Sequence, residues 1–107
     1  MTASFGTEAR HRLGTVLEGA GFRWVAGRDD PQSFGDGHAD ACSPTACLRV
    51  VRDRGQVFLQ ARPVDAEDWI AVERLLPDRA GPALTLAAVA VYIEAYLRDI
   101  TDALIGR

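Results

Sequence analysis

The sequence predicts an α+β fold: a small antiparallel sheet of three or four strands packed against an N-terminal helix, a middle helix and a long C-terminal helix. Three observations predict this class. Residues 48–62 alternate apolar and polar side chains on both sides of Arg54-Gly55, which is typical of a β-hairpin. Residues 86–104 and residues 9–20 each repeat apolar side chains at helical spacing.

Length and composition indicate one domain that spans residues 1–107. A chain of 107 residues buries enough surface for a single core. Its hydrophobic fraction of 48% and charged fraction of 25% are ordinary globular values, which argue against disorder, a fibre or a disulfide-dense miniprotein. No repeat or linker divides the chain.

The first helix is expected to be capped by Thr7, with Phe5 packing against its start. Gly21 should end this helix, because glycine tolerates the left-handed conformation common at helix ends, and Phe22 should fold back onto it. The alternation in residues 22–26 then predicts a first strand at a sheet edge.

Residues 27–43 are rich in Gly, Asp, Pro and Ser, which predicts a long connection. A connection of this length in a compact domain is either mobile or functional. One alternative stays open, namely a fourth strand between residues 32 and 41.

The hairpin has a defined register. A two-residue Arg54-Gly55 turn sets like residues opposite each other in three cross-strand pairs: Val50 with Leu59, Leu48 with Ala61, and Val51 with Phe58. A proline has no N–H to donate to a ladder, so the second strand should end at Pro63.

Two helices are expected after the hairpin. Asp65 should cap a middle helix that contains Trp69 and ends before Pro77. Thr85 should cap the terminal helix, whose apolar positions follow a heptad: Leu86, Val89, Ala90, Ile93, Leu97, Ile100 and Leu104. A second apolar row broadens this face, so the helix should lie across the sheet and touch another helix. A homodimer formed through this helix is an alternative use of its surface.

Charge and hydropathy exclude several functions. The net charge of −3 comes from Arg and acidic residues mixed along the chain, so no basic stripe predicts nucleic-acid binding. The longest apolar run, residues 84–93, is about half the ~20 residues that a membrane-spanning helix needs. The opening residues lack the pattern of a signal peptide, which favours a cytoplasmic location. The absence of Lys and Asn indicates a GC-rich genome.

The candidate metal ligands are His38, Cys42 and Cys47, with the carboxylates of Asp36 and Asp40 near them in sequence. Their spacing, His-x3-Cys-x4-Cys, lacks a paired knuckle and an unambiguous fourth ligand. The two cysteines can instead form a disulfide, or remain free thiols in a reducing compartment. The sequence leaves these three states open, and no cofactor is expected.

No nucleophile elbow, phosphate-binding loop or Cys-x-x-Cys motif occurs in the chain, so catalysis is not expected. Acidic residues are instead candidates for binding a basic protein partner: Asp29, Asp30, Asp36, Asp40, Asp65, Glu67 and Asp68. The competing interpretation makes these residues helix caps and solvated turns.

The segment Leu-Arg-Val-Val-Arg-Asp-Arg-Gly-Gln at residues 48–56, the pair Asp68-Trp69 and the order of elements resemble small bacterial α+β immunity proteins of polymorphic-toxin systems. Such proteins bind and neutralise one cognate toxin without catalysis. The resemblance implies a non-enzymatic protein-binding domain, with no active-site residues to carry over. The alternative is a small metal- or ligand-binding domain that uses residues 36–47.

Overall fold

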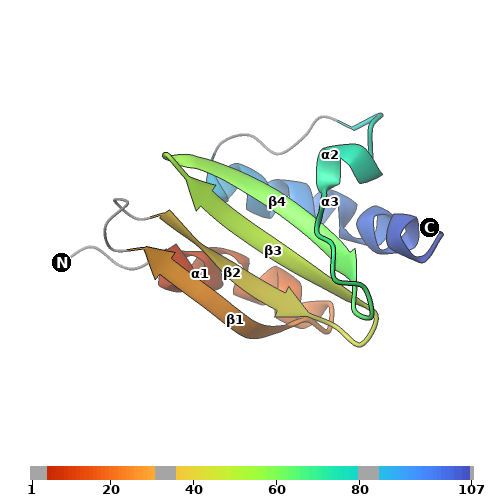
Figure 1. Ribbon diagram of the computed structural model, residues 1–107, viewed down its shortest axis with the longest axis horizontal. Helices are drawn as coiled ribbons and strands as arrows, with labels where there is room; N and C mark the ends of the chain where they lie inside the picture. Colours follow the sequence, from red (N-terminus) through yellow and green to blue (C-terminus); the bar gives the residue numbers. More distant parts are fainter. Residues whose placement is uncertain (1–4, 31–35, 80–84, 107) are drawn as a thin grey trace.

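The computed structural model describes residues 5–30, 36–79 and 85–106, without the side chains of residues 26–30 and 36. Five strands form one antiparallel sheet in the order β1-β2-β3-β4-β5 (Figure 1). The elements are α1 (Phe5–Gly19), β1 (Arg23–Asp30), β2 (Asp36–Cys42), β3 (Ala46–Asp53), β4 (Gln56–Pro63), β5 (Ile70–Ala71), α2 (Val72–Leu75) and α3 (Leu86–Ile105). The α+β class is confirmed, but the expected three or four strands are corrected to five.

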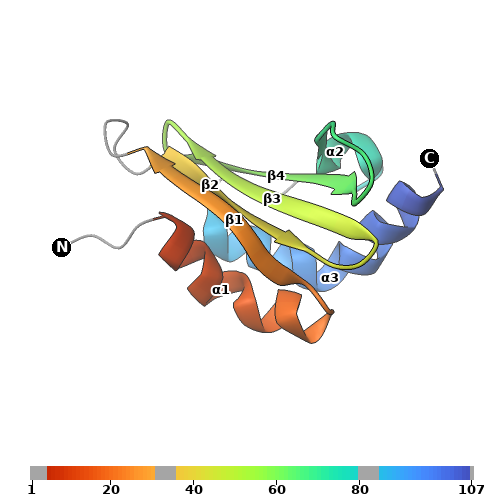
Figure 2. The same ribbon diagram turned by 60° about the horizontal axis from the view of Figure 1, so that its bottom comes forward.

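The molecule has two layers. Helices α1 and α3 lie side by side against one face of the sheet (Figure 2), where α1 contacts β1 and β2 and α3 contacts β4. In the described part of the chain no helix covers the opposite face, which is called the open face below. The three helices of the described ranges also lack the length and apolar character needed to cross a bilayer.

Helix α1 ends as the sequence predicts. Gly21 adopts φ +87°, the N–H of Phe22 donates to the carbonyl of Leu17, and the N–H of Gly21 donates to that of Glu18. These two bonds form a Schellman motif, and Phe22 folds back into the core with 3% of its surface exposed. The expected start is wrong. Helix α1 already includes Phe5, so Thr7 lies inside its first turn and is not its cap.

The long connection expected over residues 27–43 is also wrong. Strand β1 continues to Asp30, and Asp36–Cys42 forms β2, the alternative that the sequence left open. Few β-branched or aromatic residues mark β2, because its inward positions are filled by small side chains: Ala39 and Ala41 are each 1% exposed beneath the helices. Pairing with β1 and β3 on both sides therefore outweighs its weak strand propensity.

The hairpin of β3 and β4 has the predicted register in every pair, including Asp53 opposite Gln56. Arg54 and Gly55 adopt φ +53° and +79°, as the two-residue turn of a right-twisted hairpin requires. Leu48, Val50, Leu59 and Ala61 are at most 1% exposed on the inner face. Strand β1 lies at the sheet edge as expected, and a register shift between Trp24 and Ala26 leaves Val25 59% exposed.

The middle helix is much shorter than predicted. Residues 65–69 are irregular, Ile70–Ala71 pairs with β4, and only Val72–Leu75 is helical. Asp65 is therefore not a helix cap. The acidic residues do not start a helix here because tertiary contacts fix the segment in another form. Arg62 donates to the carbonyls of Pro63, Val64 and Ala66, and two arginines stack on the ring of Trp69.

Helix α3 follows the sequence prediction. The Thr85 hydroxyl accepts a hydrogen bond from the N–H of Ala88 at 3.1 Å, which caps the helix. Five of the seven heptad positions are buried: Leu86, Val89, Ile93, Ile100 and Leu104. The helix contacts both α1 and α2, as its broad apolar face predicts.

Candidate functional site

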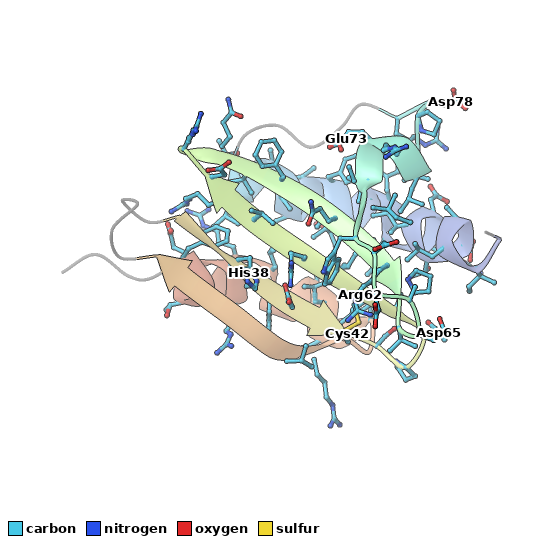
Figure 3. The ribbon with its side chains drawn as sticks, viewed as in Figure 1. His38, Cys42, Arg62, Asp65, Glu73 and Asp78 are labelled. Atoms are coloured by element: carbon cyan, nitrogen blue, oxygen red, sulfur yellow. A yellow bond between two sulfur atoms is a disulfide. The ribbon has the colours of Figure 1, made fainter. Side chains whose placement is uncertain are left out.

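The strand register arranges the open face into rows that run across the sheet. The first row, called the cysteine row, contains Arg23, Cys42, Cys47 and Arg62 on β1, β2, β3 and β4. The second row contains Asp40, Arg49 and Gln60, and the third contains His38, Val51 and Phe58. Figure 3 shows His38, Cys42 and Arg62 on this face of the sheet. The open face therefore carries nearly all the chemically distinctive side chains of the described sheet.

Asp40 is the one buried charged residue among those described, with 5% of its surface exposed. Its two carboxylate oxygens accept hydrogen bonds from Nε and Nη2 of Arg49 at 2.8 and 2.9 Å. The Nδ1 of His38 lies 3.2 Å from the same carboxylate. The hydrogen bond to Asp40 is the main cause that raises the pKa of Arg49, so the guanidinium stays charged. Because the pair is bidentate and largely buried, Asp40 serves the fold and is not available to a partner.

Arg49 and Arg62 both stack on the ring of Trp69, with their guanidinium carbons 4.4 and 4.8 Å from its centroid. Nη1 of Arg62 also donates to the carbonyl oxygens of Pro63, Val64 and Ala66. These contacts hold the irregular segment of residues 64–69 against the open face. Desolvated cation–π contacts of this kind are worth about 1–2 kcal/mol each.

Three of the predicted partner-binding acids lie together in this segment. Asp65, Glu67 and Asp68 are all exposed, and within the described ranges none of them forms an ion pair or side-chain hydrogen bond. The other predicted acids are not brought to them. Asp29 and Asp30 lie on β1 and Asp36 on β2, and their side chains are outside the described residues.

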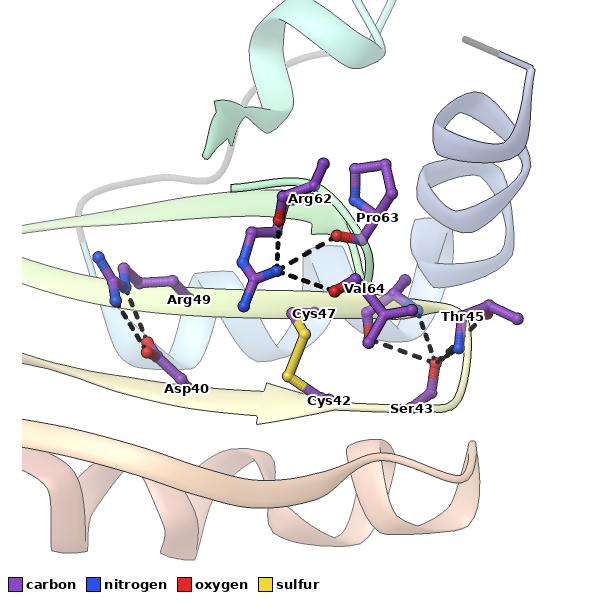
Figure 4. The surroundings of a disulfide bond; sticks show 11 residues. Asp40, Cys42, Ser43, Thr45, Cys47, Arg49, Arg62, Pro63 and Val64 are labelled. Carbon is purple, nitrogen blue, oxygen red and sulfur yellow. Dashed lines mark hydrogen bonds and ion pairs between the residues drawn. A yellow bond between two sulfur atoms is a disulfide. The ribbon is translucent and has the colours of Figure 1, made fainter. Parts of the chain in front are cut away.

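Cys42 and Cys47 face each other across β2 and β3 and form a disulfide, with their Cα atoms 4.0 Å apart (Figure 4). Of the three states left open by the sequence, this is the one found. The predicted metal ligands are not brought together, because both sulfurs are bonded to each other and His38 contacts Asp40. No group of three His, Cys, Asp or Glu side chains among the described residues is placed to bind a metal ion.

The turn that follows Cys42 is tightly bonded. The N–H of Ser43 donates to the carbonyl of Ala46 at 2.8 Å, and the Ser43 hydroxyl accepts from the N–H groups of Thr45 and Ala46. Val64 N–H donates to the Thr45 carbonyl, which joins this turn to the end of β4. The Ser43 hydroxyl is therefore bonded within the turn.

A groove of about 880 Å³ opens beside the disulfide. Its wall includes Trp24 and Arg23 from β1, Cys42 from β2, and Pro44 from the turn, while Glu18 and Phe22 come from the end of α1 and the residues after it. No sequence pattern indicates this groove, because residues 27–43 have the composition of a loop. The spacing of Cys42 and Cys47 around Ser-Pro-Thr-Ala is compatible with a short hairpin loop, and that reading would have placed the two cysteines opposite each other.

The described residues thus bring together an aromatic and guanidinium stack, exposed carboxylates at its border, and a groove beside a disulfide. Comparison with protein-family models, with curated proteins and with solved structures finds no match to this chain.

Proposed function

We propose that this chain is a non-enzymatic protein-binding domain whose partner is a basic protein, bound by the segment of residues 64–69 and the adjoining open face. The main support for the proposal is the stacking of Arg49 and Arg62 on Trp69, which is called the Trp69 clamp below. Two arginines stack on this ring and Arg62 bonds three carbonyls, so the exposed carboxylates of Asp65, Glu67 and Asp68 stand on a fixed support.

The competing interpretation made these acids helix caps or solvated turns. Residues 65–69 are not the start of a helix, so capping does not explain the carboxylates, and within the described ranges they have no cationic partner in the fold. Unpaired charges of one sign gathered on a held segment attract a partner of opposite charge and increase the rate of association. A segment that is already ordered also loses little conformational entropy on binding.

The neighbouring open face offers apolar contact area. Phe58 is 39% exposed and lies opposite half-buried Val51 on β3. Aromatic and arginine side chains are over-represented among residues that dominate binding energy. A partner that pairs basic residues with the acidic segment would place its own apolar residues over Phe58 and the Trp69 stack.

In its more specific form, the proposal is that the partner is a toxin and that this chain is the immunity protein for that toxin. It rests on the resemblance of residues 48–56 and 68–69 to that class of protein. A partner identified by binding would then arrest growth when it is expressed alone and would be harmless when it is co-expressed with this chain. A bound partner that is harmless alone would overturn the toxin form and leave the binding function standing.

The binding function is tested by affinity purification from a lysate of the source organism. The wild type and two matched triple variants serve as baits. Asp65→Asn with Glu67→Gln and Asp68→Asn removes the acidic segment. Glu18→Gln with Glu94→Gln and Asp102→Asn removes three exposed acids elsewhere and serves as the control. We expect one protein retained by the wild type and the control, lost with the first variant, and released by moderate salt. A protein retained equally by both variants, or no specific protein at all, would overturn the proposal.

A further inference from the structure

Independently of the proposed binding function, the structure assigns a second site to the cysteine row: we propose that the Cys42–Cys47 disulfide is a thiol-exchange site, at which a low-molecular-weight thiol enters the groove and attacks Cys42. Cys47 is the sulfur that leaves.

The two sulfurs differ in accessibility. Cys47 is 1% exposed, whereas Cys42 is only half-buried and forms part of the groove wall. Exchange proceeds by attack of a thiolate on one sulfur, and access decides which sulfur is attacked. A thiol from solvent therefore reaches Cys42 and not Cys47.

The order of the strands gives the correct direction of approach. Thiol–disulfide exchange is an in-line displacement, so the incoming sulfur must arrive on the side opposite the leaving sulfur. Cys47 lies on β3, whereas Arg23, which shares the open face with both sulfurs and forms part of the groove wall, belongs to β1, on the other side of β2 (Figure 4 shows the bond between β2 and β3). A thiol that reaches Cys42 from the Arg23 side of the groove would therefore approach from the side away from Cys47.

An arginine lies beside each cysteine in the row. Arg23 is the cross-strand partner of Cys42 and is exposed, so its charge attracts an anionic thiolate to the groove. Arg62 is the cross-strand partner of Cys47. A neighbouring guanidinium favours a thiolate over a thiol, so it would stabilise Cys47 as the leaving group.

The exchange reaction conserves atoms and electrons at each step. The thiolate RS⁻ forms a bond to the Cys42 sulfur, the Cys42–Cys47 bond breaks, and its electron pair remains on Cys47 as a thiolate. A second thiol, or Cys47 itself in the reverse direction, then resolves the mixed disulfide. The fold holds both sulfurs in place throughout, because hydrogen bonds of the strand ladder and of the Ser43 turn keep strands β2 and β3 paired. The bond closes a loop with a sequence separation of only 5, so opening it should leave the fold intact.

The first test compares single-cysteine variants. Cys47→Ser leaves Cys42 alone, and Cys42→Ser leaves the buried Cys47 alone as the matched control. With glutathione disulfide as the probe and intact mass as the readout, we expect Cys42 to form the mixed disulfide at least about tenfold faster than Cys47. Equal rates, or a faster reaction at Cys47, would overturn the assignment. Circular dichroism establishes that both variants are folded.

The second test uses the intact disulfide, so it does not depend on either variant folding. Reduced glutathione should open it at a rate proportional to thiol concentration. Arg23→Gln should slow opening by glutathione several-fold and slow opening by 2-mercaptoethanol less, because the glutathione thiolate carries additional negative charge on its carboxylates. Arg62→Gln should slow both thiols, because it acts on the leaving sulfur. Opening at a rate independent of thiol concentration would mean that unfolding controls access, and it would overturn the proposal.

Discussion

The guanidinium carbon of Arg49 lies 4.4 Å from the centre of the Trp69 ring, while Nε and Nη2 of the same arginine bond both oxygens of Asp40. One side chain thus joins strand β2 to the segment before β5. The shape of this segment depends on side chains of the sheet and not on its own helical signals, and the first two predictions follow from this dependence.

Trp69→Ala should release residues 64–71 from the open face. The variant loses two cation–π contacts and the burial of a large ring, so we expect the free energy of unfolding to fall by about 2–3 kcal/mol. Trp69→Phe retains an aromatic face and should lose less than half as much. Urea denaturation measures both values, and hydrogen exchange should show loss of protection at Ile70 and Ala71. Unchanged exchange there would contradict the proposed clamp.

Asp40→Ala should destabilise the chain because it leaves the Arg49 guanidinium without its partner on a largely covered surface. Breaking a buried pair costs about 3–5 kcal/mol, and we expect about 2 kcal/mol because Arg49 keeps 27% of its side chain exposed. The double variant Asp40→Ala with Arg49→Ala separates the coupling from the loss of packing. A coupling energy near zero in that cycle would mean that the pair adds nothing to stability.

The Arg54-Gly55 turn offers one substitution that should raise the stability of the chain and one that should lower it. Arg54 adopts φ +53°, a conformation that asparagine tolerates better than arginine, so Arg54→Asn should stabilise the chain by about 0.5 kcal/mol. Gly55→Ala should destabilise it by about 1 kcal/mol, because φ is +79° there. Nothing lies within 4 Å of the added Cβ, so any cost is conformational and not steric. Thermal unfolding should show a higher melting temperature for Arg54→Asn and a lower one for Gly55→Ala.

Tyr92 is 6% exposed, and in the described part of the chain its hydroxyl has no hydrogen-bond partner. Tyr92→Phe removes a buried unsatisfied group, so it should leave stability at neutral pH unchanged or raise it by about 1 kcal/mol. Tyr96→Phe, at a half-buried position on the same helix, is the matched control. A loss of more than about 1 kcal/mol on Tyr92→Phe would mean that the hydroxyl is bonded after all.

The same residue predicts a dependence on pH. Burial, together with the nearby carboxylate of Glu73, raises the pKa of Tyr92 above its ordinary value. The unfolded chain therefore loses this proton first as the pH rises through about 10, and the folded state becomes relatively less stable. Stability measured between neutral pH and about pH 11 should fall less steeply in Tyr92→Phe than in the wild type.

How far the sequence predicts this fold can be seen at particular elements. The β3–β4 hairpin and α3 are correct in register or cap because their signals are local: a turn that requires positive φ, a capping threonine and an uninterrupted apolar stripe. Strand β2 was only an open alternative to a loop, because alanines fill its inner positions and alanine is not a marker of strands. Its place is decided by its neighbours on both sides.

The site was predicted less well than the fold. The acids of residues 65–68 were identified, but their support by Trp69 and Arg62 depends on contacts between elements that no local pattern reveals. The cysteine row is invisible without the register of four strands. Asp40 has the same residue type as the exposed acids, and only its position opposite Arg49 distinguishes a buried structural pair from a free surface charge.

Each strand of the sheet pairs with its immediate neighbour in sequence, from β1 to β5. Loop-closure entropy during folding is therefore small for the sheet, and the packed elements that lie farthest apart in sequence are α1 and α3. A meander of this kind can assemble hairpin by hairpin, whereas the helical layer is complete only when the C-terminal helix has been synthesised. A nascent chain that ends before residue 86 would expose the apolar underside of β4, which α3 covers in the folded chain.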